Sequence, residues 1–202
     1  MRCLHTLPRT MVMLNHPQMK RIFFGRCSWE EYWFFLKMEK SGPVRDVLHE
    51  LKYRNGQTVG KALGKDWAQK MERFYGIPSW DVIVTVPMTK EKKKKRGYNQ
   101  CDCLAEPMSE RWNIPIEEGL LIKKTGSVSQ TLKSRMMRNT VTENPFEVVD
   151  PVRWEGMHIL LLDDVVTTGA TLEQCYTALI QIKGVRLSMA ALAIPVHNRL
   201  VI

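Results

Sequence analysis

Long apolar runs are missing from this sequence. None approaches the roughly 20 residues that a membrane-spanning helix needs, and the first residues do not have the pattern of a signal peptide. Internal repeats and low-complexity linkers are also absent. Cysteines are few, odd in number and scattered, which argues against a disulfide framework; they are Cys3, Cys27, Cys101, Cys103 and Cys175. These absences predict a cytoplasmic protein, in a reducing compartment, with no membrane partner.

What the sequence does contain is typical of one globular domain. Its 202 residues are enough for a buried core, and 44% hydrophobic with 25% charged residues is the usual balance of a soluble protein. Lysine and arginine outnumber aspartate and glutamate by 30 to 21, which gives a net charge of +9. This excess favours polyanionic partners, either a nucleotide with several phosphates or nucleic acid. Composition alone does not choose between them.

Hydrophobic patterns predict strands that alternate with helices along most of the chain. Predicted strands cover residues 29–38, 81–87, 119–123, 146–149, 159–162 and 185–194, and predicted helices cover residues 43–54, 59–74, 99–112 and 172–183. Residues 1–26, 88–98 and 124–139 show little regular pattern and are interpreted as irregular segments or loops. This alternation implies a parallel sheet with right-handed crossovers, so we expect an α/β fold.

Residues 158–171, which read HILLLDDVVTTGAT, hold the main candidate site. Two carboxylates, Asp163 and Asp164, come at the carboxyl end of a predicted buried strand, where open α/β sheets bind their ligands. A turn of small and hydroxyl residues then leads into a helix: Val165, Val166, Thr167, Thr168, Gly169, Ala170 and Thr171.

The turn and the acid pair predict different parts of one ligand. Free backbone N–H groups at a helix N-terminus bind phosphate, and Gly169 lets the backbone approach closely. The carboxylates would repel a phosphate, but they can accept hydrogen bonds from the vicinal hydroxyls of a ribose or lie near a magnesium ion. A ribose 5-phosphate satisfies both halves. The alternative interpretation is an ordinary crossover with an incidental acid pair.

The stretch LLLDDVVTTGAT resembles the phosphoribosyl-pyrophosphate (PRPP) motif of type I phosphoribosyltransferases, in which the acids hold the ribose hydroxyls and the turn binds the 5-phosphate. Three further stretches add to this resemblance: KYRNG at 52–56, VPMTKEKKKKRGYNQ at 86–100 and QTLKSRMMRN at 130–139. In order and spacing, the four together resemble the ComF family of competence-associated, phosphoribosyltransferase-like proteins. The resemblance covers nearly the whole chain.

The resemblance implies a type I phosphoribosyltransferase fold, with a central, mostly parallel sheet flanked by helices and a small hood. Residues 1–40 would form the N-terminal segment or hood, and residues 41–202 the phosphoribosyltransferase-like domain. ComF-like proteins usually begin with a zinc ribbon of two CxxC pairs, of which only Cys3 could be a remnant. Because thiolate coordination of zinc needs about four ligands, which Cys3 and His5 cannot supply, we expect no zinc in this chain.

The resemblance also implies two further binding elements. Residues 86–90 lie where the family has its pyrophosphate-binding loop, so Pro87, Met88 and Thr89 are candidate PRPP contacts, and we expect the bond before Pro87 to be trans. In the following basic segment, Arg96 is the best candidate for a bidentate contact with the diphosphate, although a solvated loop is an equal alternative. Residues 130–139 lie where the family has a mobile loop, whose candidate PRPP contacts are Lys133, Arg135 and Arg138; a purely structural loop is again an alternative.

The implied function is transfer of the phosphoribosyl group of PRPP to an unidentified acceptor, with release of pyrophosphate. Magnesium would arrive with PRPP, and Asp163 and Asp164 would stabilise positive charge on the ribose ring. The alternative is a non-catalytic nucleotide sensor or partner protein in competence and DNA uptake. Direct nucleic-acid binding through residues 90–96 is a less favoured option, because interleaved exposed aromatics are missing there. A homodimer is also compatible with the sequence.

Overall fold

A five-stranded sheet forms the centre of the fold, and its strand order is β1-β2-β7-β6-β3. The computed structural model describes residues 7–13, 22–53, 56–124 and 144–195. Four neighbouring strands are parallel, and β1 is an antiparallel edge strand. The strands are β1 (Arg9–Met13), β2 (Tyr32–Met38), β3 (Val82–Thr85), β6 (His158–Val165) and β7 (Arg186–Pro195). The prediction of an α/β fold with a mostly parallel sheet is confirmed.

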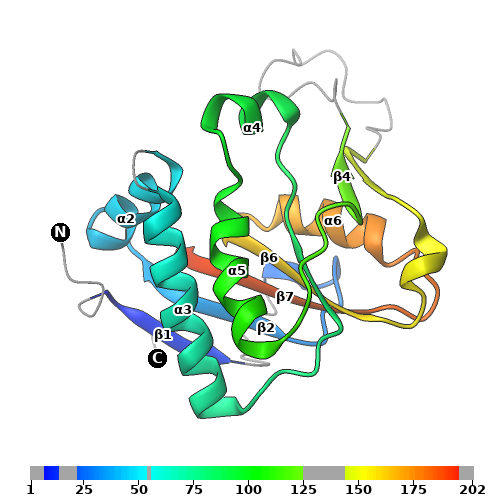
Figure 1. Ribbon diagram of the computed structural model, residues 1–202, viewed down its shortest axis with the longest axis horizontal. Helices are drawn as coiled ribbons and strands as arrows, with labels where there is room; N and C mark the ends of the chain where they lie inside the picture. The colour runs from blue at the N-terminus through cyan, green and yellow to red at the C-terminus, as the bar shows by residue number, and fades with distance from the viewer. Residues whose placement is uncertain (1–6, 14–21, 54–55, 125–143, 196–202) are drawn as a thin grey trace.

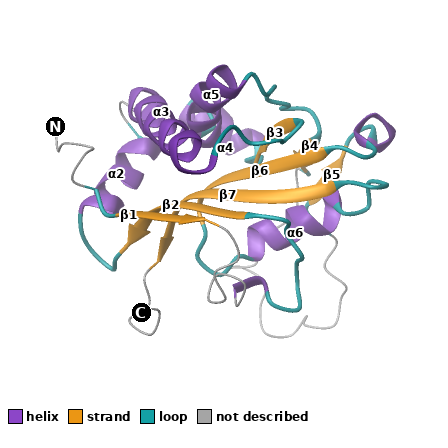
Figure 2. Ribbon diagram, turned by 90° about the horizontal axis from the view of Figure 1, so that it is seen from below, coloured by secondary structure: helices purple, strands orange, loops and turns teal. Residues whose placement is uncertain are grey.

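Helices cover both faces of this sheet (Figures 1 and 2). One face packs against α2 (Pro43–Lys52), α3 (Gly56–Tyr75) and α5 (Gln100–Trp112). The other face packs against α6 (Ala170–Leu179), the two-stranded sheet of β4 (Leu121–Lys123) and β5 (Phe146–Val148), and a short 3-10 helix, η2 (Pro151–Trp154). Figure 2 shows α6 on the side of the sheet opposite to α2, α3 and α5.

The aliphatic run of β6 explains its central position. Ile159 and Leu161 lie in the core on the α6 side, whereas Leu160 and Leu162 lie in the core on the side of α3 and α5. All four side chains are fully buried. Because successive side chains of a strand point to opposite faces, an unbroken aliphatic run fits only a strand that is covered on both sides.

Helices α3 and α5 pack closely because α3 presents glycine to its neighbour. A Cβ atom on Gly64 would lie 2.3 Å from the carbonyl oxygen of Leu104 and 2.7 Å from Cγ of Pro107. One turn earlier, a Cβ atom on Gly60 would lie 2.7 Å from Cβ of Cys103. The close contact between α3 and α5 therefore depends on glycine, which has no side chain, at these two positions. Helix α5 continues through Pro107 without a break.

Three predicted segments differ from the structure. The predicted loop 88–98 contains a helix, α4 (Lys90–Arg96), which Thr89 caps by accepting a hydrogen bond from the backbone N–H of Lys92 and which ends at Gly97 with φ 86°. Residues 1–26, predicted to be irregular, contribute β1. The predicted helix 172–183 is α6, which ends at Leu179. The chain then turns through residues 180–184 before β7 begins. The helix predicted from the spacing of apolar residues therefore extended too far at its C-terminal end.

Residues 1–40, predicted as a hood, contribute β1 and β2 to the main sheet. Directly before β2, the carboxylate of Glu31 accepts hydrogen bonds from Trp33 Nε1 at 3.1 Å, Trp80 Nε1 at 2.9 Å and Ser188 Oγ at 3.3 Å. These contacts attach the start of β2 to the chain that precedes β3 and to β7. The described backbone has no cis peptide bond, so Pro87 is trans as predicted. Within the described ranges, no helix has the length and apolar character needed to cross a membrane.

Candidate functional site

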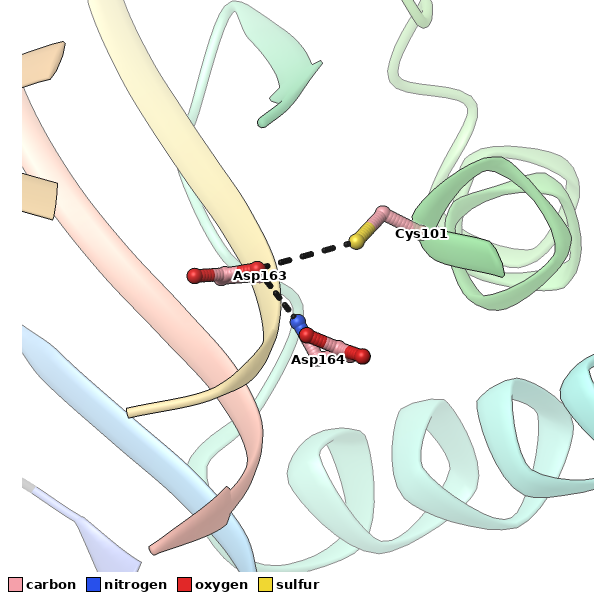
Figure 3. A group of neighbouring side chains, drawn as sticks. All are labelled: Cys101, Asp163 and Asp164. Carbon is pink, nitrogen blue, oxygen red and sulfur yellow. Dashed lines mark hydrogen bonds between the residues drawn. The ribbon is translucent and has the colours of Figure 1, made fainter. Parts of the chain in front are cut away.

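The acid pair lies at the end of β6, and the two side chains leave the strand in different directions (Figure 3). Asp163 is 8% exposed and Asp164 is 7% exposed. The sequence placed both after the strand, but β6 continues to Val165 because its ladder with β7 runs as far as the pair Val165–Ala193. Buried carboxylates need compensating partners, so their contacts define the site.

Asp164 contacts donors from two helices. Nζ of Lys52, the last residue of α2, lies 3.1 Å from Asp164 Oδ2. Nε2 of Gln100, the first residue of α5, donates to the same oxygen at 3.1 Å. The ammonium group neutralises the charge of this carboxylate in a buried place. Neither Lys52 nor Gln100 was among the residues predicted to form the site.

The contacts of Asp163 are of a different kind. Its Oδ1 accepts from the backbone N–H of Asp164 at 2.8 Å, and Sγ of Cys101 lies 3.9 Å from the same oxygen (Figure 3). Burial, followed by the neighbouring charge of Asp164, raises the pKa of Asp163 from 3.8 to about 8. Burial also raises the pKa of Cys101, so its thiol stays protonated. Burial and the neighbouring charge therefore favour the protonated form of Asp163.

A chain of polar contacts joins the basic helix α4 to the acid pair. The guanidinium of Arg96 donates to Oε1 of Gln100, whose amide in turn donates to Asp164. Asn99 caps α5 by accepting from the backbone N–H of Cys101 at 3.2 Å. Arg96, predicted to face a diphosphate, is thus connected to the acids through Gln100.

The turn that opens α6 is exposed along most of its length. Thr167, Thr168, Ala170 and Thr171 are exposed, Val165 is half-buried, and Val166 and Gly169 are buried. The N-cap residue of α6 is Gly169, which has φ 79° and no side chain that could cap the helix. The hydroxyl of Thr168 accepts from the backbone N–H of Ala170 at a long 3.4 Å. These features keep hydroxyl and N–H groups available to an anion.

The segment before β2 lies against this turn. A Cβ atom on Gly169 would lie 2.7 Å from Cε1 of Phe23, which is fully buried. Nη1 of Arg26 forms an ion pair with Glu173 at 2.6 Å, and Nη2 donates to the carbonyl oxygen of Thr168 at 3.3 Å. A guanidinium group therefore lies beside the turn, a contact that the sequence did not predict.

The other predicted PRPP contacts lie in two places. Because β3 and β6 are adjacent and parallel, the loop after β3 leaves the same edge of the sheet as the acid pair. In that loop Pro87, Met88 and Thr89 are half-buried, and the Thr89 hydroxyl accepts from the backbone of Lys92 at 3.3 Å. Three predicted residues lie outside the described part of the chain: Lys133, Arg135 and Arg138.

The side chains around the acid pair do not form an all-oxygen cage for magnesium. In the described ranges, one group of His, Cys, Asp and Glu side chains has the spacing of a metal site: Cys101, Asp163 and Asp164, with potential ligand atoms within 4.8 Å of one another. One of the three is a thiol, and the Lys52 ammonium lies against Asp164. Magnesium prefers oxygen ligands and commonly binds with substrate phosphates. The described residues therefore offer carboxylate oxygens beside a thiol and an ammonium group rather than a complete set of magnesium ligands.

Comparison with known proteins finds relatives, although no family model matches the chain. The DNA utilization protein YhgH of Salmonella typhi is 29% identical over 135 residues, which cover 65% of this chain and 59% of that protein. Competence protein ComFC of Bacillus subtilis is 28% identical over 148 residues, which cover 73% of this chain and 58% of that protein. Competence protein F of Haemophilus influenzae is 24% identical over 136 residues, which cover 65% of this chain and 59% of that protein. The matches therefore span less than two thirds of each relative.

Solved structures also overlap with this chain. A glutamine PRPP amidotransferase from Bacillus subtilis overlaps with 67% of this chain and 26% of its own, at 22% identity and a TM-score of 0.44. An adenine phosphoribosyltransferase from Thermoanaerobacter pseudethanolicus overlaps with 68% of this chain and 80% of its own, at 13% identity and a TM-score of 0.41. The sequence matches confirm the resemblance that the four stretches indicated: this chain is similar to YhgH, to competence protein ComFC and to competence protein F.

Proposed function

We propose that this protein binds PRPP at the carboxyl ends of β3 and β6. The main support is that a buried acid pair and an exposed, uncapped helix N-terminus follow one another on β6 and α6. The turn would bind the 5-phosphate through N–H groups and the hydroxyls of Thr167, Thr168 and Thr171, and the acids would accept the ribose hydroxyls. Arg26 contacts the turn at the carbonyl oxygen of Thr168, and Arg96 is connected to Asp164 through Gln100.

The chemistry that fits such a ligand is phosphoribosyl transfer to an acceptor. The bond between the anomeric carbon and a pyrophosphate oxygen breaks, pyrophosphate leaves with the bonding electrons, and the acceptor forms the new bond to that carbon. The acid pair would stabilise positive charge on the ribose ring, and Arg96 would interact with the leaving pyrophosphate. Magnesium bound to the diphosphate would neutralise part of its charge. The alternative for the same pocket is nucleotide sensing without turnover, in a protein of the competence machinery.

Ligand-dependent thermal unfolding tests this proposal. With PRPP and magnesium at 100 times the dissociation constant, wild type should gain about 2.7 kcal/mol, which raises the Tm by roughly 5–10 °C for a chain of this size. Asp164→Asn should lose most of this gain, whereas Asp150→Asn, an isosteric change at an exposed position, should keep it. Magnesium alone and pyrophosphate alone serve as ligand controls. If wild type shows no shift under saturating PRPP, the non-catalytic partner role becomes the better account.

A second candidate function is nucleic-acid binding, which the exposed lysines of α4 support. Helix α4 has no buried residue, and Lys90, Lys92, Lys94 and Lys95 are all exposed on it. A cationic surface of this kind binds phosphate backbones with an affinity that falls as salt rises. Replacing Lys92, Lys94 and Lys95 with glutamine should then weaken single-stranded DNA binding and flatten its salt dependence. If the triple variant binds as wild type does, α4 is not a nucleic-acid surface.

A further inference from the structure

One oxygen of the acid pair receives two donors that come from different helices. Lys52 Nζ and Gln100 Nε2 both lie 3.1 Å from Oδ2 of Asp164. Asp163 instead accepts from a backbone N–H and faces the thiol of Cys101. The two acids are adjacent in sequence and almost equally buried, but of the two only Asp164 contacts an ammonium group and a side-chain amide that can fix its orientation.

Further contacts hold these donors in place. The hydroxyl of Tyr98 donates to the carbonyl oxygen of Leu51 at 2.8 Å, which joins the end of α2 to the segment before α5. The Arg96 guanidinium occupies Oε1 of Gln100, so the amide nitrogen of that side chain is the atom that faces Asp164. Lys52, the first residue of the KYRNG stretch, and Gln100, the last residue of the stretch 86–100, therefore meet at one carboxylate.

We propose that Lys52 and Gln100 are positioning residues that hold Asp164 as the acid gripping the ligand's ribose hydroxyls, while Asp163 plays a lesser part. This assignment rests on the proposed PRPP site and deepens it. A carboxylate accepts hydrogen bonds from hydroxyl groups, and its negative charge opposes positive charge on a ribose ring. Because Lys52 and Gln100 both occupy Oδ2, Oδ1 remains as the oxygen of Asp164 that neither of them takes.

Titration calorimetry with PRPP and magnesium separates the roles of the two acids. Loss of a hydrogen bond to a charged group corresponds to a change in Kd of about 10- to 100-fold. We expect Asp164→Asn to weaken binding at least tenfold more than Asp163→Asn, although both changes are isosteric. If Asp163→Asn weakens binding as much as Asp164→Asn or more, the assignment is wrong.

The same titration tests the positioning residues. Lys52→Met should weaken binding about tenfold, and Lys52→Arg should restore most of it because the positive charge returns. Lys65→Met, a matched change at an exposed position of α3, should have no effect. Gln100→Ala should weaken binding in the same direction as Lys52→Met. A Kd for Lys52→Met equal to that of the Lys65 control would overturn the proposal.

A measurement without ligand keeps this inference separate from the proposed function. In carbon-detected NMR of the free protein, Lys52→Met should move the side-chain carboxyl resonance of Asp164 more than that of Asp163. Lys52→Arg should return the Asp164 resonance toward its wild-type position. An unmoved Asp164 resonance would refute the positioning role, whether or not wild type binds PRPP. Failure of wild type to bind PRPP would instead refute the proposed function.

Discussion

Alanine at Gly64 should destabilise this fold, because the α3–α5 contact has no room for a side chain. The added Cβ would lie 2.3 Å from the Leu104 carbonyl oxygen, far inside normal contact distance, and 2.7 Å from Cγ of Pro107. A backbone oxygen cannot rotate away as the end of a long side chain can. Helix α5 must therefore shift as a unit, and with it Gln100 and Cys101 at its first turn.

The expected magnitude is the difference between two opposing effects. Alanine gains about 1 kcal/mol over glycine from its helix propensity. Forcing extra volume into a packed interior costs about 1–3 kcal/mol, and sometimes more. A clash with a backbone atom costs an amount near the upper end of that range, so we expect the free energy of unfolding to fall by about 1–2 kcal/mol. For a chain of this size, that loss lowers the Tm by roughly 2–8 °C.

Thermal unfolding followed by circular dichroism measures this effect. Gln69→Ala is the matched control, because Gln69 is exposed on the same helix and surface changes usually stay within about 0.5 kcal/mol. If Gly64→Ala is as stable as wild type or more stable, then α3 and α5 are not in the close contact described and the reasoning fails.

Three further changes have defined outcomes. The pKa of Asp163 rises from 3.8 in the unfolded chain to about 8 in the fold, so between these pH values the folded state binds a proton that the unfolded state releases, and the free energy of unfolding falls as pH rises from about 4 to 8. Urea unfolding at pH 5 and pH 8 should show a smaller fall in this free energy for Asp163→Asn than for wild type. Equal falls for the two proteins would contradict the pKa shift. Tyr98→Phe removes the hydroxyl that donates to Leu51 and should lower the free energy of unfolding by about 1 kcal/mol, whereas an unchanged urea midpoint would show that this bond contributes nothing. Gly169→Ala places a Cβ 2.7 Å from Phe23 at a backbone φ of 79°, so it should lower the Tm and speed proteolysis near the Phe23 segment; a wild-type cleavage rate would argue against that packing.

Sequence patterns predicted the parts of this fold that local residues determine. The aliphatic run before Asp163 is confined to one strand and identifies β6 as central without any tertiary information. The predicted helix 99–112 begins where the side chain of Asn99 accepts from the backbone N–H two residues ahead, which is a local contact. The lysine-rich α4 was missed because its run of like charges is typical of a solvated loop, although Thr89 and Gly97 supply both caps.

The partners of the acid pair could not be predicted from local pattern. Gln100 is separated from Asp164 by 64 positions, and Cys101 from Asp163 by 62. Only the packing of α5 against the sheet brings them together, and no periodicity encodes a single contact at that range. The alternation of a strand does imply that Asp163 and Asp164 point to opposite faces. That signal could have suggested unequal surroundings for the two carboxyl groups.

The position of β2 between β1 and β7 limits how this domain can be shortened or recombined. Removal of the chain up to Met38 would leave β7, a ten-residue strand, as an unpaired edge of the sheet. Its free N–H and C=O groups would then pair with strands from other molecules. Replacement of the segment from Phe23 to Met38 is therefore hazardous, because Phe23 and Arg26 also pack against the turn before α6.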